Sequence, residues 1–360
     1  MKNILVTGGA GFIGSNFIHH ILGQNHEIKV LNIDALTYAG NLDNLADLES
    51  SSRYDFIHGD IRDTKLIKTV LTDYRIDTVV HFAAESHVDR SIVNPTEFIL
   101  TNVVGTANLL NASLAFWDGL DSIRKTAFRF LHISTDEVFG SLSKNDPAFT
   151  EKSPYSPNSP YAASKASADL LVRAYFKTYG FPAIISNCSN NYGPYQYPEK
   201  LIPLIILNCL EGQPLPLYGD GLQIRDWLFV EDHCEALLSI LKKGIIGHSY
   251  NIGGSNQPSN LEITRQICNI MDILKPDSSF APHEQLITFV KDRPGHDRRY
   301  AMDISKISKE LSWQPSHDLS EGLEKTVRWY LANLDWVEKI KDRPSYKGWI
   351  DKNYNRRMKI

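Results

Sequence analysis

The sequence predicts an α/β protein with a doubly wound parallel sheet and a smaller C-terminal α/β lobe. Three observations predict it. Strand-like and helix-like segments alternate from residue 3 to about residue 190, the strand runs are apolar almost throughout, and prolines break the rhythm after residue 191. Near-continuous apolar runs, such as residues 78–82, are typical of parallel strands buried on both faces. Alternating β and α units imply right-handed crossovers within one sheet.

The elements follow from the same patterns in chain order. Short apolar runs predict strands, and longer amphipathic segments predict helices. After residue 191 the elements become shorter, which indicates a second lobe. We expect strands at 4–7, 29–33, 55–58, 78–82, 130–134 and 183–187, and helices at 14–22, 63–74, 95–116 and 161–179. We expect a first domain at 1–190, a second lobe mainly at 191–330 and a C-terminal tail at 331–360. Residues 223–230 and nearby segments are candidates to rejoin the sheet of the first domain.

Composition excludes several classes of protein. Of 360 residues, 42% are hydrophobic and 22% charged, as is ordinary for soluble globular proteins, and a net charge of −4 argues against a nucleic-acid partner. The first strand run begins almost at once, without a signal-peptide core, so we expect a cytoplasmic protein with no membrane partner. The wide spacing of the four cysteines favours reduced thiols and predicts no metal site. They are Cys188, Cys209, Cys234 and Cys268.

A glycine motif follows the first predicted strand. Gly8, Gly11 and Gly14 have the spacing GxxGxxG and lie between a strand and a helix. In a Rossmann-type fold such glycines allow a tight turn, a close approach of the backbone to a pyrophosphate, and close helix packing. The helix N-terminus then offers N–H groups and a positive dipole end to the phosphates. A Gly-rich turn alone would be weak evidence, but this position predicts a dinucleotide site in domain 1–190.

The acids after the next two strands bear on the choice of cofactor. Asp34 ends the second strand, twenty residues after Gly14, where a carboxylate accepts hydrogen bonds from the adenosine ribose. A 2′-phosphate there would meet like charge, and no arginine follows nearby. The sequence therefore favours NAD over NADP. Asp60 is a candidate for the adenine edge, with a solvated turn acid as the alternative.

The motif Tyr161-Ala-Ala-Ser-Lys165 indicates a proton-transfer site. Positions i and i+4 share one face of a helix, so Lys165 lies beside Tyr161. A tyrosine with a pKa near 10 is a poor base, but a neighbouring ammonium and a nicotinamide cation favour its phenolate. Tyr161 can then take a proton from a substrate hydroxyl while hydride leaves the same carbon. Downstream of the glycine motif, this pair marks a short-chain dehydrogenase/reductase.

The third motif, Thr135-Asp136-Glu137, follows an apolar strand at the end where open α/β sheets bind ligands. Thr135 suits the orientation of the hydroxyl that is oxidised. Two carboxylates are more than simple redox chemistry needs. One alternative is an acidic turn at a helix N-terminus, but the following residues predict no obvious helix. Paired carboxylates that titrate apart supply the acid and the base for an elimination.

Several segments together resemble the dTDP-glucose 4,6-dehydratase family of extended short-chain dehydrogenases, from Lys2 to about Pro315. The Thr-Asp-Glu triplet is the most specific of them, and the tail after about Trp329 matches less clearly. The segments are residues 81–91 (His-Phe-Ala-Ala-Glu-Ser-His-Val-Asp-Arg-Ser), 134–140, 161–165, 190–194 (Asn-Asn-Tyr-Gly-Pro), 225–227 (Arg-Asp-Trp) and 293–297 (Arg-Pro-Gly-His-Asp).

The resemblance implies a three-step reaction on a nucleotide sugar. Tyr161 would deprotonate the C4 hydroxyl held by Thr135 as hydride passes to NAD. Glu137 would then remove the C5 proton while Asp136 protonates the departing C6 hydroxyl, and hydride would return to C6. Helices 95–116 and 161–179 would pair with their symmetry mates in a homodimer.

The resemblance also implies binding residues. Arginines there could present guanidinium forks to a pyrophosphate. Tyr218 could stack on the nucleotide base, and a tyrosine packed in the core is the alternative. The implied cofactor-binding residues are Gly8, Gly11, Phe12, Ile13, Gly14, Asp34, Asp60, Ile61, Ala83, Ala84, Ser86, Tyr161, Lys165 and Asn191, and the implied substrate-binding residues are Ser86, Thr135, Asn190, Glu199, Lys200, Leu201, Pro216, Tyr218, Arg225, Asn260, Arg293 and His296.

Three alternatives stay open. The first is the same chemistry on a UDP-, CDP- or GDP-linked hexose, because base selectivity depends on few side chains. The second is a 4-epimerase, which would have no need of Asp136 and Glu137. The third is a non-catalytic NAD-binding protein, which would usually have lost Tyr161 or Lys165.

Overall fold

A seven-stranded parallel sheet forms the centre of the computed structural model, which describes residues 1–351. Its strand order, β10-β6-β5-β4-β1-β2-β3, reverses direction between β1 and β4, so the fold is doubly wound as predicted. The sheet strands are β1 (Asn3–Thr7), β2 (Lys29–Asp34), β3 (Tyr54–His58), β4 (Thr78–His81), β5 (Arg129–Thr135), β6 (Ala183–Cys188) and β10 (Ser249–Ile252).

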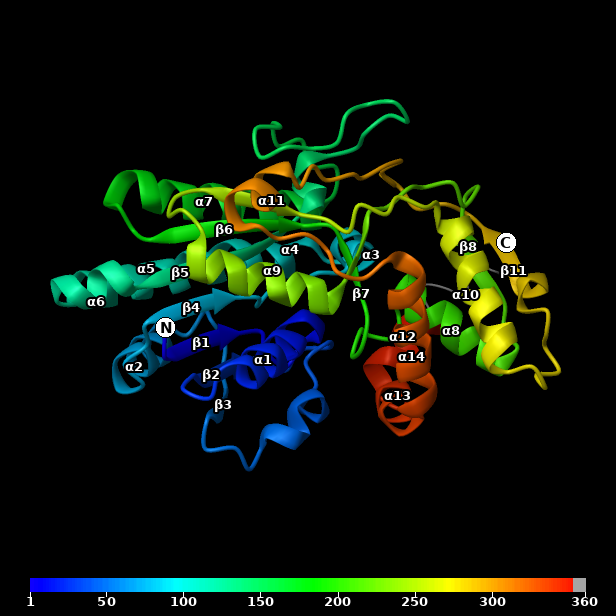
Figure 1. Ribbon diagram of the computed structural model, residues 1–360, viewed down its shortest axis with the longest axis horizontal. Helices are drawn as coiled ribbons and strands as arrows, with labels where there is room; N and C mark the ends of the chain where they lie inside the picture. The colour runs from blue at the N-terminus through cyan, green and yellow to red at the C-terminus, as the bar shows by residue number, and fades with distance from the viewer. Residues whose placement is uncertain (352–360) are drawn as a thin grey trace.

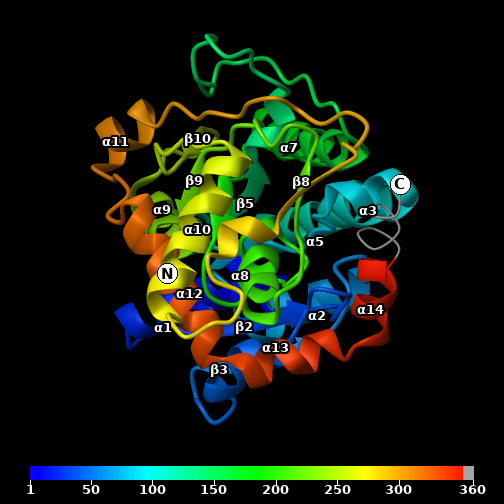
Figure 2. The same cartoon turned by 90° about the vertical axis from the view of Figure 1, so that its right-hand side faces the viewer.

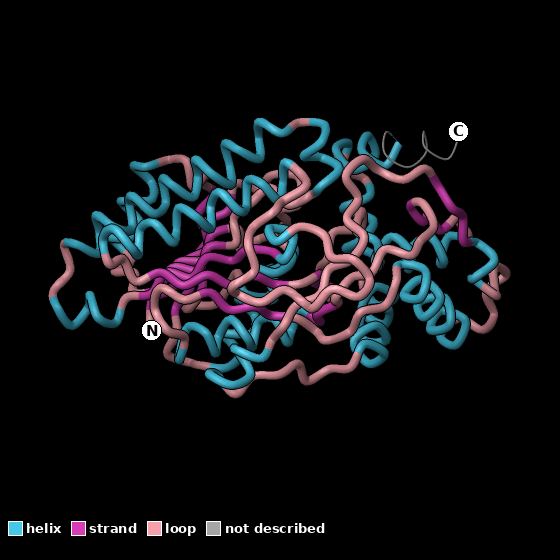
Figure 3. Tube along the Cα trace, turned by 90° about the horizontal axis from the view of Figure 1, so that it is seen from above, coloured by secondary structure: helices cyan, strands magenta, loops and turns pink. Residues whose placement is uncertain are grey.

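Both faces of the sheet are covered by helices, as Figure 3 shows from above. In β1, Ile4 and Val6 belong to the hydrophobic core on one face and Leu5 to the core on the other, which explains the unbroken apolar runs. The first face carries η1 (Leu42–Leu48), α1 (Phe12–Gln24), α9 (Val230–Lys243) and α11 (Ser305–Leu311); the second carries α2 (Thr64–Asp73), α5 (Thr106–Asp118) and α7 (Pro160–Tyr179), with α3 (Val88–Val93), α4 (Pro95–Phe98) and α6 (Ser122–Ala127) beside them.

The predicted helix 95–116 has an irregular middle. The π-helical segment η2 (Ile99–Gly105) joins α4 to α5. The whole stretch Pro95–Asp118 is long and apolar enough to cross a membrane by length and composition, and 44% of its most apolar window is buried within this fold. The core helix of a soluble protein passes the same test.

A smaller lobe lies at one end of the sheet, coloured green to red in Figure 1. Strand β9 pairs with β7 in a separate two-stranded sheet, whereas β10 joins the central sheet. The lobe elements are β7 (Asn190–Tyr192), α8 (Leu201–Glu211), β8 (Leu215–Tyr218), β9 (Trp227–Phe229), α10 (Asn260–Leu274), η4 (His283–Leu286), β11 (Ile287–Val290), α12 (Leu319–Ala332), α13 (Leu334–Lys341) and α14 (Pro344–Ile350). Of the predicted tail 331–360, residues 352–360 lie outside the described part.

Candidate active site

The carboxyl ends of the central strands open into a cavity of about 320 Å³ between the sheet and the lobe. The glycine motif forms one wall. Gly8 has φ +75°, and a Cβ there would lie 2.5 Å from the Ala83 nitrogen, so only glycine fits this turn. A Cβ on Gly14 would lie 2.4 Å from the Gly8 oxygen, so this glycine allows α1 to pack against the loop. The loop, the N-terminal end of α1 and the acid at the end of β2 together fit NAD.

Asp34 supports the glycine loop. Its carboxylate accepts hydrogen bonds from the backbone N–H of Ala10 (2.9 Å) and of Leu36 (2.8 Å). Burial raises the pKa of Asp34, and these two N–H groups oppose the shift. Asp60 pairs instead with Arg62 at 2.6 Å, and Arg62 also contacts Glu97 at 3.2 Å. Arg62 therefore lines the cavity with its charge already engaged by two carboxylates, which favours NAD over NADP.

All the cofactor-binding residues expected from the sequence line this one cavity. They come from the loop after β1, from α1, β2, α7 and β7, and from the loops after β3 and β4. They are Gly8, Gly11, Phe12, Ile13, Gly14, Asp34, Asp60, Ile61, Ala83, Ala84, Ser86, Tyr161, Lys165 and Asn191.

The triplet Thr135-Asp136-Glu137 lies at the end of β5, inside the same cavity. The expectation that no helix follows was wrong, because Asp136–Phe139 forms one turn of 3-10 helix, η3. Thr135 caps this turn by accepting the Glu137 N–H at 3.3 Å, and its hydroxyl donates to Asp136 Oδ1 at 3.1 Å. The turn therefore places two adjacent, buried acids in the lining of the cavity.

The two acids have different surroundings. Burial raises the pKa of Asp136 well above its usual range, and the charges of Glu137 and Asp226 add to this shift. Burial also raises the pKa of Glu137, but three cations, Arg293, Arg225 and Lys200, oppose it. The protonated form is therefore favoured more at Asp136 than at Glu137.

Tyr161 and Lys165 lie on α7 and line the same cavity as the triplet. In the protein alone, burial and the nearby Glu137 raise the pKa of Tyr161, and a hydrogen bond with Thr135 opposes the shift. The lowered pKa expected from the sequence therefore requires the cation of the bound cofactor as well as Lys165. The Lys165 ammonium donates to the Ile133 carbonyl at 2.7 Å, which anchors it against β5.

Four of the expected substrate-binding residues line the cavity. They are Ser86, Thr135, Asn190 and Lys200. Arg225 and Arg293 lie behind them, near enough for their charges to act on Glu137. Arg225 donates to the Asp297 carbonyl at 3.0 Å, and Arg293 contacts Asp89 at 3.4 Å.

The other six are not among the residues that line the cavity. Glu199 accepts a hydrogen bond from Arg90 at 2.8 Å. Tyr218 donates to Asp89 at 3.2 Å and packs against the His296 ring, while His296 contacts Asp292 at 2.6 Å. Asn260 begins α10, and its buried Oδ1 has no hydrogen-bond partner. Leu201 begins α8, and Pro216 is buried in β8.

The motifs in the sequence did not predict that Tyr38, Gln196 and Tyr197 line the cavity. These residues carry no motif of their own, and packing brings them together. The Arg90 guanidinium lies 3.9 Å from the Tyr38 ring centre and 4.4 Å from that of Trp349. The helix that ends the described chain thus reaches the wall of the cavity.

Helices α13 and α14 also brace the segment that follows β2, and they run beneath the lobe in Figure 2. Trp336 donates to Asn44 at 2.8 Å, and Arg343 donates to Asn41 at 2.7 Å. Asn44 and the Asn41 backbone in turn donate to the carbonyl of Ala10, each at 3.0 Å. The C-terminal helices are therefore linked to the glycine loop through two asparagines.

Comparisons with known proteins agree with this geometry. The profile of a family described as GDP-mannose 4,6 dehydratase matches residues 5–326. A dTDP-glucose 4,6-dehydratase of Neisseria meningitidis serogroup B is 55% identical over 94% of this chain and 96% of its own, and one of Salmonella typhimurium is 53% identical over 99% of both. The crystal structure of a dTDP-glucose 4,6-dehydratase from Streptomyces venezuelae with NAD bound has a TM-score of 0.85 at 45% identity and covers 94% of this chain and 100% of that one.

Proposed function

The chain belongs to the dTDP-glucose 4,6-dehydratase family, and we propose that it converts dTDP-glucose to dTDP-4-keto-6-deoxyglucose and water. It is an NAD-dependent hydro-lyase. The observation that carries this assignment is the pair of acids on η3, which share one cavity with the glycine loop and Tyr161. A 4-epimerase needs the glycine loop and the tyrosine but has no use for two acids.

The first step is oxidation at C4. When bound, NAD accepts the C4 hydride and later returns it to C6, and its cationic ring favours the Tyr161 phenolate. Tyr161 removes the C4 hydroxyl proton, and Thr135 orients that oxygen. Lys165 stabilises the phenolate by its positive charge.

The second step is elimination of water across C5 and C6. The C4 ketone acidifies the C5 proton, which Glu137 removes. Lys200, Arg225 and Arg293 favour the ionised form of Glu137 that this role requires. Asp136, held protonated by burial, donates its proton to the departing C6 hydroxyl, which leaves as water. In the third step the hydride would return from the reduced cofactor to C6 while a proton returns to C5, which completes the 4-keto-6-deoxy sugar.

We assign the sugar nucleotide to the lobe side of the cavity. Lys200, Arg225 and Arg293 supply positive charge for a pyrophosphate, with Ser86, Asn190 and Asn260 as polar partners. Residues 1–190 bind NAD, residues 191–330 mainly bind the substrate, and the tail from residue 331 braces the cofactor loop. Glu199, Leu201, Pro216, Tyr218 and His296 complete the proposed substrate-binding set.

We also propose a homodimer in the cytoplasm. Ile99, Val104 and Leu170 are about half exposed on η2 and α7, at 52%, 48% and 54%, which favours a partner for these helices. The four cysteines are free and buried, as suits a reducing compartment. Light scattering after size exclusion measures the mass, and Val104→Glu is expected to yield monomers.

The assignment is tested with purified protein and dTDP-glucose, UDP-glucose, CDP-glucose and GDP-mannose. Mass spectrometry is expected to find loss of one water from dTDP-glucose. Loss from another nucleotide would keep the chemistry and change the substrate. A changed sugar configuration without water loss would indicate an epimerase. Tyr161→Phe is expected to slow formation of bound NADH, and an unchanged rate would remove Tyr161 from its role.

A further inference from the structure

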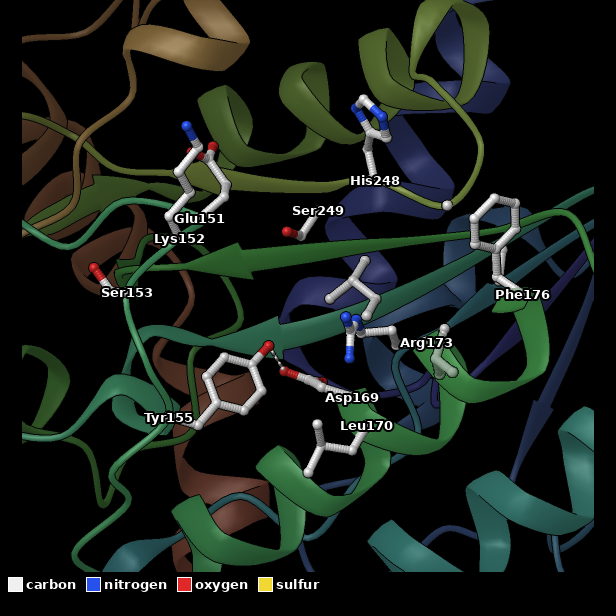
Figure 4. A pocket seen from close by; sticks show the side chains of 14 residues that line it. Glu151, Lys152, Ser153, Tyr155, Asp169, Leu170, Arg173, Phe176, His248 and Ser249 are labelled. Carbon is white, nitrogen blue, oxygen red and sulfur yellow. Dashed lines mark hydrogen bonds between the residues drawn. The ribbon is translucent and has the colours of Figure 1, made fainter. Parts of the chain in front are cut away.

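A second cavity, of about 410 Å³, lies beside α7 at the β6–β10 edge of the sheet (Figure 4). Its lining includes Tyr155, Asp169, Arg173 and His248. Asp169 connects this cavity to the catalytic cluster, because it lies one helical turn after Lys165 and contacts the strand that carries the catalytic triplet.

The Asp169 carboxylate is 1% exposed and joins three parts of the fold. Its Oδ2 accepts hydrogen bonds from Ser134 on β5 (2.8 Å), from Tyr155 in the preceding loop (2.9 Å) and from Asn187 on β6 (3.2 Å). Its Oδ1 lies 3.2 Å from Nε2 of His132. Burial and the Lys165 charge lower the pKa of His132 to about 4, so this imidazole is neutral near pH 7. These neighbours are neutral. The charged groups near Asp169 on α7 are Lys165, one turn before it, and Arg173, one turn after it, which also lines the cavity.

Lys165 is the buried cation on which the charge of Asp169 acts. It is 4% exposed, so burial lowers its pKa, and the Asp169 carboxylate opposes the shift. Groups from the neighbouring strands also face Lys165. Burial raises the pKa of Cys188 on β6 to about 12, and burial lowers the pKa values of His132 on β5 and His81 on β4. These three groups are neutral near pH 7, so Asp169 supplies the negative charge beside Lys165.

We propose that Asp169 is a positioning residue of the active site, which holds Lys165 protonated and fixes the end of β5 through Ser134. A protonated Lys165 in turn favours the Tyr161 phenolate. The proposal rests on the Tyr161–Lys165 chemistry of the proposed function.

The kinetic test compares Asp169→Asn with the wild type across pH, with formation of bound NADH from dTDP-glucose as the readout. Without the negative charge, Lys165 loses its proton at lower pH, so the alkaline limb of the pH–rate profile is expected to move to lower pH by about one unit. Asp169→Glu should return this limb to its wild-type position. Tyr155→Phe is the matched control, because it removes one hydrogen bond to Asp169 and leaves the charge. An equal loss of rate at every pH in Asp169→Asn, with the limb unmoved, would overturn the proposal.

A direct measurement separates this proposal from the proposed function. In protein labelled with ¹³C-lysine, the Lys165 signal is assigned by its absence in Lys165→Arg and followed by NMR as pH rises. The wild type is expected to hold an ammonium near pH 7.5, and Asp169→Asn to titrate about one unit lower. A neutral Lys165 near pH 7.5 in the wild type would overturn the proposal even if Asp169→Asn does not fold. Failure to convert dTDP-glucose would affect only the proposed function.

Discussion

The two sides of the main cavity are built in different ways. The cofactor side comes from short contiguous motifs, in which Gly8, Gly11 and Gly14 lie in the loop after β1 and the first turn of α1, and Asp34 ends the adjacent strand. The substrate side takes Lys200, Arg225 and Arg293 from separate parts of the lobe. One side therefore depends on local backbone geometry, and the other on packing between distant segments. The residues that we propose as catalytic lie where the two sides meet.

The largest expected effect is at that meeting point. Glu137→Gln removes the proposed base for C5 and is expected to lower the rate of water loss by about 10²- to 10⁴-fold. Oxidation at C4 does not need Glu137, so bound NADH should still form after dTDP-glucose is added. Absorbance of NADH and mass spectrometry of the sugar measure the two steps separately. Normal dehydration would exclude Glu137 as the base.

A charge change on the substrate side should leave the cofactor side intact. Lys200→Met removes one of the three cations that face Glu137. The KM for the sugar nucleotide is expected to rise about 10- to 150-fold, because a charge-assisted hydrogen bond contributes about 1.5–3 kcal/mol. The NAD content of the purified protein, measured after denaturation, should not change. A drop in NAD content would mean that the two sides are not separable.

Gly8→Ala tests the cofactor side through its backbone. The alanine would have to adopt the φ of +75° that Gly8 has, and its Cβ would lie 2.5 Å from the Ala83 nitrogen. We expect a loss of about 1–3 kcal/mol in unfolding free energy and a lower NAD content. Gly23→Ala is the matched control, since no atom lies within 4 Å of a Cβ there. Denaturant unfolding of both variants measures the difference, and equal stabilities would contradict the expectation.

The smallest expected effect lies at the C-terminal brace. Trp336→Phe keeps the aromatic packing but loses the hydrogen bond to Asn44. The expected loss is about 1 kcal/mol in unfolding free energy, with faster release of NAD, because Asn44 holds the Ala10 carbonyl of the glycine loop. The protein is loaded with labelled NAD and diluted into excess unlabelled NAD, and the loss of bound label with time measures the release rate. An unchanged rate of NAD release would mean that the hydrogen bond from Trp336 to Asn44 affects stability and not cofactor binding.

Much of the cofactor side was predictable from the sequence, because short contiguous segments of the chain form it. The apolar run 78–82 became β4, and the glycine spacing became the turn that lines the cavity. The turn after Thr135 was harder, since no helix was expected where η3 forms. A single 3-10 turn has too few residues to leave a periodic pattern.

By itself, the sequence determined the doubly wound sheet, the cofactor class and the identity of the acids beside Thr135, because hydrophobic period and motif spacing are properties of short segments. Only the tertiary structure decided that Arg225 and Arg293 act on Glu137 from behind the cavity wall, that Asp169 lies between Lys165 and a second cavity, and that Trp336 braces the loop after β2. These contacts join segments far apart in the chain. They follow from how the layers pack, which short segments do not specify.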